Sequence, residues 1–563
     1  MISRREFLQA FSALSTIYGT SLPIHSANAK TKITEDDLLG LKPYGNVTLA
    51  HITDLHAQLM PLWFREPSIN LGIGDVEGKP PHLTGDDFLN HFNIKAGTPE
   101  AYALQSKDFL KLAQQYGQMG GIDRIATVLK HIRAERPDNT LFLDGGDTWQ
   151  GSYTALKTKG ADMVEIMNAL KPDAMTGHWE FTLGETRVKE IVKDLTFPFL
   201  GANIFDNEWE EPAFEAVKFF ERGGVKVAVI GQAFPYTPIA NPRWMIPNWS
   251  FGIREEEIKK QVANAREKGA KLVVLLSHNG FDVDRKLASR VKGIDVILCG
   301  HTHDAMPTPL KEGNTLLIAS GSSGKFISRL DLDVGTEGVK GYNFRLIPIF
   351  SDILTPDQDM SALVKKIRTP YEKELNRTIG QTENLLYRRG NFNGTMDDLI
   401  CNALLEERDA EIALSPGFRW GPTLLPGQKI TVEDIYNVCA ITYPAAYRTN
   451  MTGKQLKDIF EDVADNLFNP DPYYQQGGDM VRVGGLKLTI NPTKKMGERI
   501  TNMTHLKTKQ PIDLNKDYVV AGWASVNKET KGPPIWDVIE NYLSNHTPVR
   551  VKTNDNIKII KDT

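Results

Sequence analysis

Apolar runs alternate with amphipathic stretches through the first 350 residues of this 563-residue chain. Strand-like runs, short and rich in Val, Ile and Leu, occupy 47–53, 139–146, 225–232, 271–277 and 294–298. Stretches with apolar residues at the helical period lie between them, at 121–135, 161–170 and 255–269. Alternation of this kind predicts a mostly parallel, helix-flanked α/β sheet whose sites lie at the carboxyl ends of strands. We therefore expect a catalytic domain over residues 43–350.

A chain of 563 residues exceeds one common core, so at least two domains are expected. Residues 355–377 are charged and helical in period, with Pro370 inside, and predict a linker helix that kinks or restarts. Residues 378–563 mix helical stretches with short strands and predict a smaller mixed α/β domain. Residues 60–118, rich in Pro, Gly and Asp, predict an insertion near the mouth of the site.

Composition narrows the class of protein. A formal charge of −4 and a pI near 6.3 give no basic surface for nucleic acid. Beyond the N-terminus, no segment has the apolar span of about 20 residues that a membrane helix needs. Of the three cysteines, Cys299 follows a strand and is expected to be buried and inert, while the sequence leaves open whether Cys401 and Cys439 pair.

The N-terminus is expected to direct export. Residues 3–8 read Ser-Arg-Arg-Glu-Phe-Leu, a modest apolar stretch follows, and Ala27-Asn-Ala29 supplies small residues at the end. This pattern resembles a twin-arginine signal peptide cleaved after Ala29, so residues 1–29 are set apart from the fold and a periplasmic destination is predicted.

Carboxylates and imidazoles gather behind the apolar runs or in Gly turns. Oxygen and nitrogen ligands of this kind suit divalent metals such as Mn, Zn and Fe. The remaining histidines lack such context and are interpreted as ordinary polar residues. The candidate ligands are Asp54, His56, Asp147, His178, His278, His301 and His303.

The spacing Asp54-x-His56, Gly146-Asp147, His278 and Gly300-His-x-His303 resembles the calcineurin-like metallophosphoesterases, and the two-domain layout resembles their 5'-nucleotidase branch. The resemblance implies a layered sheet sandwich with a nucleotidase-like second domain. It also implies two metals bridged by Asp147, which lower the pKa of a shared water from about 15.7 towards 7 and so provide hydroxide. One metal would be held by Asp54, His56, Asp147 and His303, the other by Asp147, His178, His278 and His301.

One motif departs from the nucleotidases. They carry Gly-Asn-His-Glu-Phe-Asp, in which Asn binds metal, His protonates the leaving oxygen and Asp orients that His. Here Gly177-His-Trp-Glu-Phe-Thr182 puts His178 in place of the ligand, Trp179 in place of the acid and Thr182 in place of its partner. An alkoxide leaving group needs a proton, whereas a sulfur leaving group, with a reference thiol pKa near 8.5, departs as an anion.

The chain resembles the SoxB family of periplasmic thiosulfohydrolases in three features. These are the departure at 177–182, the segment SPGFRWG at 415–421 and the leader. The resemblance implies a dimanganese enzyme of the sulfur-oxidation pathway. Its hydroxide would hydrolyse a sulfonate from an S-thiosulfonate or S-sulfonate on the carrier cysteine of SoxYZ, releasing sulfate.

The resemblance also suggests substrate residues in the second domain. Arg419 occupies the place of a substrate-binding Arg in nucleotidases, and its planar fork suits a sulfonate or a phosphate. We expect Asp147 and Arg419 to be catalytic, and Arg419, Trp179, Tyr443 and Tyr474 to bind substrate. Tyr473 and Arg448 are weaker candidates. Nucleotidases present an aromatic residue for the base where this chain has Met480.

Two other functions remain open at this point. The metal set alone would also suit a periplasmic 5'-nucleotidase or related phosphoesterase, although Trp179, Thr182 and Met480 argue against it. A non-catalytic, metal-stabilised binding protein is the second alternative. The complete set of ligands for a hydroxide-generating pair argues against that reading.

Overall fold

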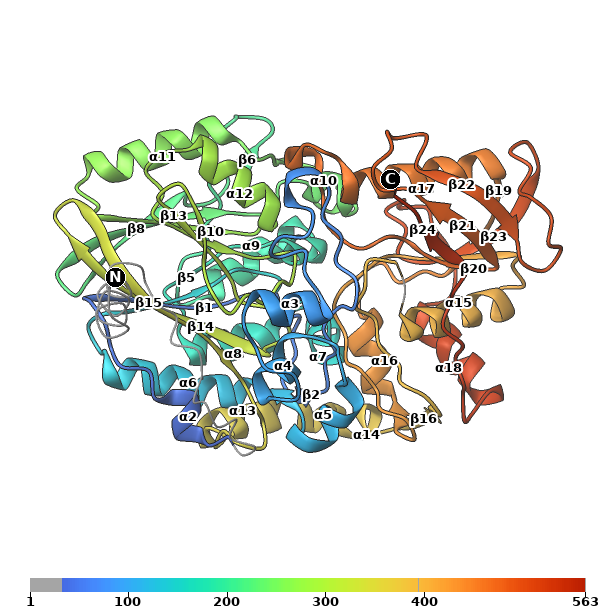
Figure 1. The fold of residues 1–563 in the computed structure, drawn as a ribbon, viewed down its shortest axis with the longest axis horizontal. Coiled ribbons are helices and arrows are strands. Elements are labelled where there is room, and N and C mark those ends of the chain that lie inside the picture. Colours follow the sequence, from blue (N-terminus) through green and yellow to red (C-terminus); the bar gives the residue numbers. More distant parts are fainter. Residues whose placement is uncertain (1–32, 393, 562–563) are drawn as a thin grey trace, which may run out of the picture.

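The computed structural model describes residues 33–392 and 394–561. The chain forms two regions side by side, and the segment 60–118 lies along the boundary between them (Figure 1). The predicted signal peptide at 1–29 falls outside the described residues. In the part of the chain that is described, every helix is too short or too polar to span a bilayer.

Two sheets form the first region, in the orders β15-β14-β1-β4-β5 and β12-β13-β11-β10-β8-β7. The strands of the first are β1 (Val47–Ile52), β4 (Thr140–Asp144), β5 (Ala174–Met175), β14 (Phe326–Gly335) and β15 (Gly338–Pro348). Those of the second are β7 (Val217–Arg222), β8 (Val225–Gln232), β10 (Leu272–Ser277), β11 (Val296–Cys299), β12 (Leu310–Glu312) and β13 (Thr315–Ala319). Each sheet has a parallel set, β1-β4-β5 and β8-β10-β11-β13, that continues into antiparallel edge strands.

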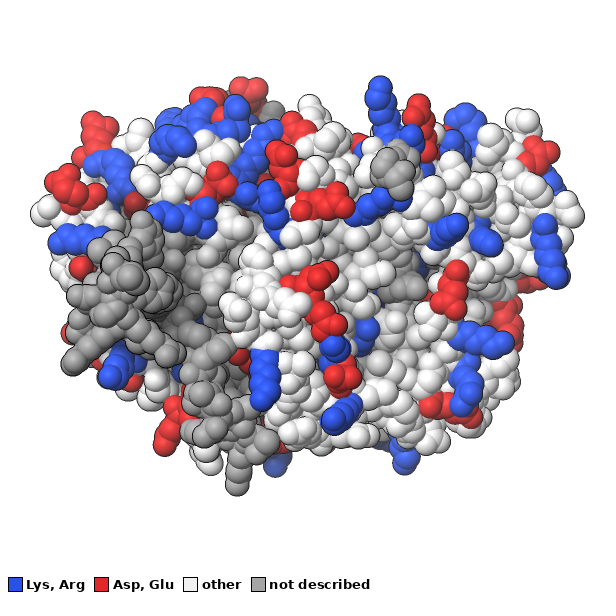
Figure 2. All heavy atoms as spheres, in the orientation of Figure 1, with Lys and Arg blue, Asp and Glu red and all other residues white. Residues whose placement is uncertain are grey.

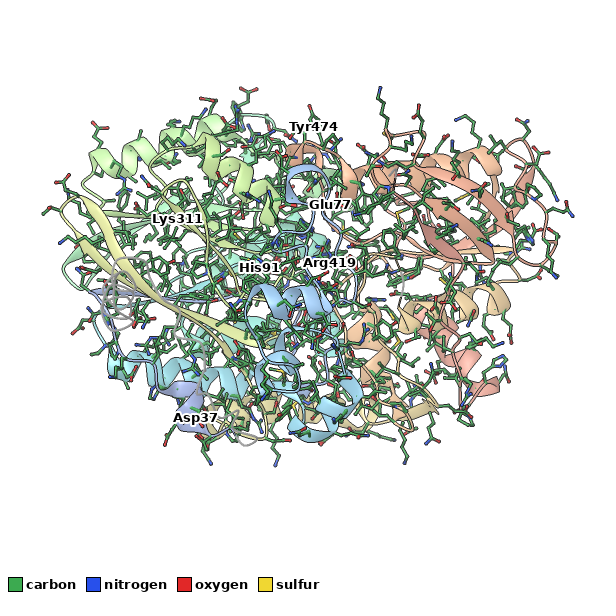
Figure 3. All side chains as sticks on the ribbon, in the orientation of Figure 1. Asp37, Glu77, His91, Lys311, Arg419 and Tyr474 are labelled. Carbon is green, nitrogen blue, oxygen red and sulfur yellow. The ribbon has the colours of Figure 1, made fainter. Side chains whose placement is uncertain are left out.

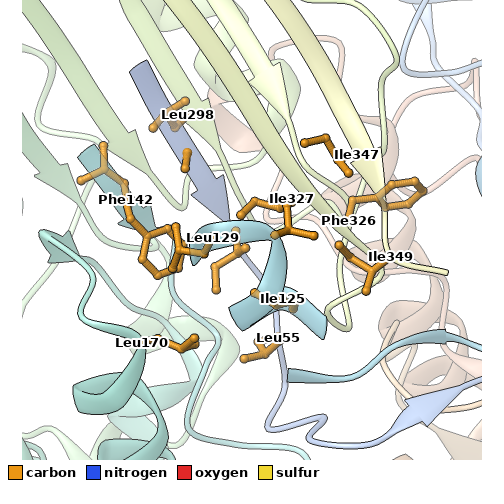
Figure 4. Close-up of a cluster of buried hydrophobic side chains, with 14 of the residues drawn as sticks. Leu55, Ile125, Leu129, Phe142, Leu170, Leu298, Phe326, Ile327, Ile347 and Ile349 are labelled. Atoms are coloured by element: carbon orange, nitrogen blue, oxygen red, sulfur yellow. The ribbon is translucent and has the colours of Figure 1, made fainter. Parts of the chain in front are cut away.

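Side chains of both sheets share one core. Leu298 of β11 belongs to the same buried cluster as Phe142 of β4 and Ile327 of β14 (Figure 4). All three are at most 1% exposed. Each such side chain contributes roughly 1.5–3 kcal/mol to folding. This shared core fixes the strand ends of one sheet relative to those of the other.

Helices cover the outer faces of the sandwich. In α6 (Ile122–Glu135), Ile122, Ile125, Leu129 and Ile132 recur every three or four residues and are all buried, so the apolar stripe predicted from the sequence faces the sheet. The other helices of this region are α2 (Glu35–Leu39), α7 (Tyr153–Thr158), α8 (Ala161–Leu170), α9 (Glu185–Asp194), α10 (Thr237–Ala240), α11 (Glu255–Glu267) and α12 (Phe281–Arg290). The predicted layered α/β sandwich is confirmed.

The segment 60–118 forms a small helical unit against the sandwich. It contains β2 (Pro61–Leu62), α3 (Gly85–His91), α4 (Pro99–Leu104) and α5 (Phe109–Tyr116). The strand that follows it, β3 (Met119–Gly120), pairs with β2. After the sandwich, α13 (Gln358–Arg368) packs on α6 and α8. The chain passes Pro370 in a 3-10 turn and continues as α14 (Glu372–Leu375), so the expected interruption at this proline is present.

The second region is a smaller mixed α/β unit, as predicted. Its main sheet has the order β19-β23-β17-β20, and two smaller sheets have the orders β22-β21-β24 and β16-β18. The strands are β16 (Thr378–Gln381), β17 (Ile412–Ser415), β18 (Lys429–Thr431), β19 (Tyr447–Thr452), β20 (Arg482–Gly484), β21 (Leu486–Ile490), β22 (Ile500–His505), β23 (Asp517–Gly522) and β24 (Ile557–Ile559). The helices are α15 (Thr395–Glu407), α16 (Val432–Cys439), α17 (Gly453–Phe468) and α18 (Ile535–Asn545).

The cysteines and surface charges complete this picture. Cys299, Cys401 and Cys439 are all buried free thiols, so the pairing of Cys401 with Cys439 that the sequence left open is absent from the structure.

Basic and acidic side chains are intermixed on the face shown in Figure 2, in keeping with the small net charge.

Candidate metal centre

The candidate ligands follow the carboxyl ends of five strands. Asp54 and His56 follow β1, Asp147 follows β4, His178 follows β5, His278 follows β10, and His301 and His303 follow β11. The shared core brings these five ends to one place, and none of the seven side chains is more than 9% exposed. The clustering expected from the sequence is therefore present.

The seven side chains form two groups, Asp54-His56-Asp147-His303 and Asp147-His178-His278-His301. Within each group the ligand atoms lie within 4.8 Å of one another. Asp147 belongs to both, and its Oδ2 lies 3.1 Å from His278 Nε2, 3.4 Å from His178 Nδ1 and 3.6 Å from His56 Nε2. Two groups that share one carboxylate fit a dinuclear centre.

Several ring nitrogens have no partner except each other and the carboxylates. Within residues 33–392 and 394–561, His178 Nδ1 and His278 Nε2 are buried without a hydrogen bond. The Nε2 atoms of His56 and His303 are 3.2 Å apart. Two ring nitrogens so close need a cation or a proton between them. The donor set therefore fits divalent metal ions.

Burial keeps most of these imidazoles neutral, which is the form that binds metal. It lowers the pKa of His56 to about 4 and the pKa values of His301 and His303 well below the ordinary value. His278 differs: burial opposes its charge, but the carboxylates of Asp147 and Asp54 outweigh burial and raise its pKa to about 10. The two buried carboxylates thus attract positive charge into the site.

Five of the candidate ligands have a left-handed backbone. The φ angles are 52° at Asp54, 48° at His56, 57° at Asp147, 76° at His301 and 59° at His303. Asp, Asn and His tolerate this region better than most residues, and branched side chains avoid it. Backbone strain of this kind is common at functional sites, where the surrounding structure holds it in place.

Glu180 fixes the two loops that carry Asp147 and His178. Its carboxylate accepts hydrogen bonds from the backbone N–H groups of Thr148 at 2.6 Å and His178 at 2.7 Å. In addition, the backbone N–H of Trp179 donates to Asp147 Oδ1 at 2.7 Å. Glu180 is fully buried, so these bonds hold the bridging carboxylate against its neighbour.

The second region closes the site. A cavity of about 240 Å³ lies between the regions, and its wall includes Asp147, His178, His301 and His303 as well as Arg419 and Trp179. Arg419 Nη1 donates to the backbone carbonyl of His301 at 3.2 Å, and Arg419 Nε lies 3.5 Å from Asp479 Oδ1. Burial lowers the pKa of Arg419 from its very high ordinary value. This predicted residue thus lies beside the candidate ligands, between the two regions (Figure 3).

Trp179 lies in an aromatic cluster from the second region. Its ring centroid is 4.9 Å from that of Trp420 and 5.1 Å from that of Phe418, and Tyr443 lies nearly parallel to it at 6.3 Å. The hydroxyl of Thr182 donates to the backbone carbonyl of Trp179 at 2.7 Å and is thereby occupied. Tyr443 is 9% exposed and packs with this cluster.

Other predicted substrate residues lie apart from the cavity. Tyr474 is 65% exposed at the outer edge and is not among the residues on the cavity wall (Figure 3). Tyr473 donates to Glu255 at 2.9 Å, and the Arg448 side chain is exposed and donates to the carbonyl of Arg408 at 2.9 Å. The structure therefore does not bring these three side chains to the ligands.

Sequence reasoning missed residues that surround the ligands. Phe418 and Trp420 flank the predicted Arg419, and their alternation along the segment was the available signal. Arg389 is 5% exposed and lines a second cavity with His303 and Asp304. Its Nε and Nη1 find no hydrogen-bond partner among the described residues. His51, interpreted from the sequence as an ordinary polar residue, is fully buried on β1 and bonds Ser320 Oγ at 2.7 Å.

Comparisons with known proteins agree with this geometry. The model of the calcineurin-like phosphoesterase family matches residues 47–305, and that of the 5'-nucleotidase C-terminal domain matches residues 378–548. The chain is 25% identical to human 5'-nucleotidase over 466 residues, which are 74% of this chain and 79% of the human protein. A 5'-nucleotidase precursor from Thermus thermophilus shares the fold, with a TM-score of 0.71 and 21% identity, over 92% of this chain and all of that one.

A second solved structure is more similar. The sulfate thiohydrolase SoxB of Thermus thermophilus, in complex with glycerol, is 36% identical, with a TM-score of 0.90. The match covers 93% of this chain and 98% of that one. Together with the buried Asp and His groups, these matches show a hydrolase of the metallophosphoesterase and 5'-nucleotidase superfamily with a dinuclear metal site. Within that superfamily, the chain belongs to the SoxB family of sulfate thiohydrolases.

Proposed function

We propose that this protein hydrolyses a sulfonate group from a sulfur atom on a carrier-protein cysteine and releases sulfate. The substrate would be an S-thiosulfonate or S-sulfonate on the SoxYZ carrier, during thiosulfate oxidation. The bond between the carrier's sulfur and the sulfonate sulfur breaks, and a water oxygen forms the new bond to the sulfonate sulfur. The carrier keeps both electrons of the broken bond as a thiolate or persulfide, and the water protons pass to solvent.

Trp179 carries this proposal. It stands at the position of the nucleotidase acid, inside an aromatic cluster, and its indole is no acid for a leaving oxygen at neutral pH. Besides the candidate ligands and Arg419, the ionisable residue on the described cavity wall is Asp462, which is exposed. A wall without a buried general acid suits a sulfur leaving group, because a thiolate needs little protonation.

Each group around the cavity then has a role in the proposal. Two divalent ions would be held by the seven candidate ligands, and Asp147 is common to both groups. These ligands are Asp54, His56, Asp147, His178, His278, His301 and His303. When bound, such ions acidify water and stabilise negative charge on the group under attack. We propose manganese, by resemblance to the family. Arg419 orients the sulfonate oxygens, and Trp179 forms an apolar wall beside the carrier's sulfur, with Tyr443 packed parallel to it.

The cellular setting is part of the same proposal. Resemblance to the SoxB family implies a sulfur-oxidation pathway, and the Thermus thermophilus nucleotidase is described as a precursor. Both descriptions support an exported enzyme, and the arginine pair at residues 4 and 5 supports the twin-arginine route to the periplasm.

Side-by-side assays decide between this function and its main alternative. The metal-loaded protein is given a carrier peptide with a cysteine S-sulfonate or S-thiosulfonate, and sulfate is measured; in parallel it is given AMP, and phosphate is measured. We expect sulfate release that depends on metal, with AMP turned over slower by the roughly 100- to 10,000-fold that general acid catalysis contributes. Efficient AMP hydrolysis without sulfate release would restore the periplasmic 5'-nucleotidase.

A further inference from the structure

The outer nitrogens of the candidate metal-site imidazoles do not all bond within their own region. His278 Nδ1 donates to the carbonyl of Gly145 at 2.7 Å, inside the sandwich. His56 and His301 instead lead to the second region, the first through one amide side chain and the second directly. Outer partners of this kind set the tautomer and orientation of a metal-binding His.

The first path starts at His56. Its Nδ1 lies 3.2 Å from Gln150 Oε1, and Gln150 Nε2 donates to the backbone carbonyl of Ala440 at 2.7 Å. Ala440 follows α16 directly, so this carbonyl belongs to the second region. Gln150 is 4% exposed, and both bonds are therefore shielded from water. With the amide oxygen as acceptor, His56 carries its proton on Nδ1 and presents Nε2 to Asp147.

His178 is held within the first region. Its Nε2 lies 3.1 Å from Asn241 Oδ1, which leaves Nδ1 towards Asp147. Asn241 is 3% exposed, and its Nδ2 is buried without a hydrogen-bond partner among the described residues, so no hydrogen-bonded path continues from it to the second region.

The second path is direct. His301 Nε2 donates to the backbone carbonyl of Gln476 at 3.0 Å. A Cβ on the next residue, Gly477, would lie 2.4 Å from that same nitrogen. The backbone of the second region thus rests on the ring, and Arg419 reinforces the contact by donating to the His301 carbonyl at 3.2 Å.

We propose that docking of the second region and metal binding form one coupled equilibrium. The docked second region holds the outer nitrogen of His56 through Gln150 and that of His301 directly, so both rings present a lone pair inward before a metal arrives. By linkage, bound metal must favour the docked arrangement by the same free energy. Gln150 and the loop 476–478 are then positioning residues for the centre. This inference is independent of the substrate.

Two neighbouring glycines give a matched test. Both have left-handed φ angles, 72° at Gly477 and 83° at Gly478, so alanine strains the backbone similarly at either position. Alanine at 477 collides with His301, whereas alanine at 478 meets nothing closer than 3.9 Å. Metal affinity is measured by competition of full-length protein with a Mn²⁺ chelator. We expect Gly477→Ala to lower the binding affinity for one of the two Mn²⁺ ions by about 10- to 100-fold, the usual effect of losing an outer hydrogen-bond partner of a metal-binding His. In Gly478→Ala the Mn²⁺ affinity should stay within about threefold of the parent value.

Equal affinities in Gly477→Ala and Gly478→Ala would overturn the proposal, provided that both apo proteins keep the parent's circular dichroism. Gln150→Leu tests the first path. It should lower the Mn²⁺ affinity of the group that contains His56 by a similar factor. If neither Gly477→Ala nor Gln150→Leu changes affinity, the paths are packing contacts only.

Hydrogen exchange tests the reverse direction without any catalytic readout. Adding Mn²⁺ to the apo parent should slow amide exchange in residues 438–443 and 476–480, which carry no candidate ligand. In Gly477→Ala this protection of 476–480 should be reduced, while in Gly478→Ala it should persist. Protection confined to the loops that follow β1, β4, β5, β10 and β11 would show that metal binding stops at the sandwich, and would reject the coupling.

Discussion

The indole of Trp420 stacks on the imidazole of His56, with ring centroids 4.9 Å apart and ring planes inclined by 22°. Trp420 comes from the second region and is 2% exposed. We expect Trp420→Ala to lower the free energy of unfolding of the apo protein by about 3–5 kcal/mol, the usual cost of emptying a buried Trp site. Denaturant titration followed by circular dichroism measures this.

Trp209→Ala is the control, because Trp209 is 71% exposed. It should change the free energy of unfolding by less than about 0.5 kcal/mol. If Trp420→Ala is equally mild, the stacking on His56 adds nothing to stability.

His178 supplies the second prediction. His178→Ala removes a nitrogen 3.4 Å from Asp147 Oδ2, so the Mn²⁺ content of the purified protein should fall from two ions towards one. Elemental analysis measures it. His131→Ala, on the outer face of α6, should keep full content. Two tightly held ions in His178→Ala would exclude His178 as a ligand.

Arg419 supplies the third. Arg419→Lys keeps the charge but loses the planar fork that can hold two sulfonate oxygens. We expect kcat/KM on the sulfonated carrier to fall by a factor equivalent to about 1–3 kcal/mol. Arg448→Lys is the matched control, because Arg448 is exposed and bonds the carbonyl of Arg408. Equal kinetics in the two variants would leave Arg419 without a role in substrate binding.

The buried hydrogen bonds to Glu180 supply the fourth prediction. Glu180→Gln replaces one acceptor oxygen by an NH₂ group that faces backbone N–H donors, including those of Thr148 and His178. The free energy of unfolding should fall by about 1–3 kcal/mol, because buried donors lose their acceptor. Thermal unfolding measures it, with Glu190→Gln on the exposed side of α9 as control. An unchanged midpoint in Glu180→Gln would mean that water replaces the lost acceptor.

Asp398 gives a prediction for pH. Burial raises its pKa to about 7 in the folded protein, against an ordinary value of 3.8. The folded state therefore binds the proton more tightly than the unfolded state does. This contribution to stability is full below about pH 4 and is lost as pH rises through about 7. Asp398→Asn should flatten the fall in unfolding free energy over that window, as measured by denaturant titrations at several pH values. A slope identical to the parent's would reject the raised pKa.

The ligand cluster could be read from the sequence because each member follows an apolar strand or a Gly turn. A strand that ends in Asp54-x-His56 or His301-x-His303 is recognisable from the sequence. The core shared by the two sheets then brings these strand ends together. The aromatic cover and the outer partners have no such signal. Gln150 bonds a backbone carbonyl, and the Gln476 carbonyl bonds His301, so neither contact depends on a recognisable side-chain motif.

The predicted substrate residues differ in the same way in how far the sequence could place them. Arg419 sits in a segment whose neighbours fix it next to His301, and the resemblance placed it there. Tyr474 was chosen for its residue type in a Gly- and Pro-rich stretch, and such stretches do not specify which way a side chain faces. The structure turns Tyr474 outward and brings Gly477 and Gly478 of the same stretch to the cavity instead.

The left-handed backbone at five of the candidate ligands bears on how such a centre can change over evolutionary time. At Asp54, His56, Asp147, His301 and His303 the main chain favours Gly, Asn, Asp and His over most other residues, whatever the metal requires. His178 lies outside this group, since its φ is −152°. The Asn-to-His difference that the resemblance to nucleotidases implies falls at His178. A lineage that changes its ligand there leaves these five left-handed turns as they are.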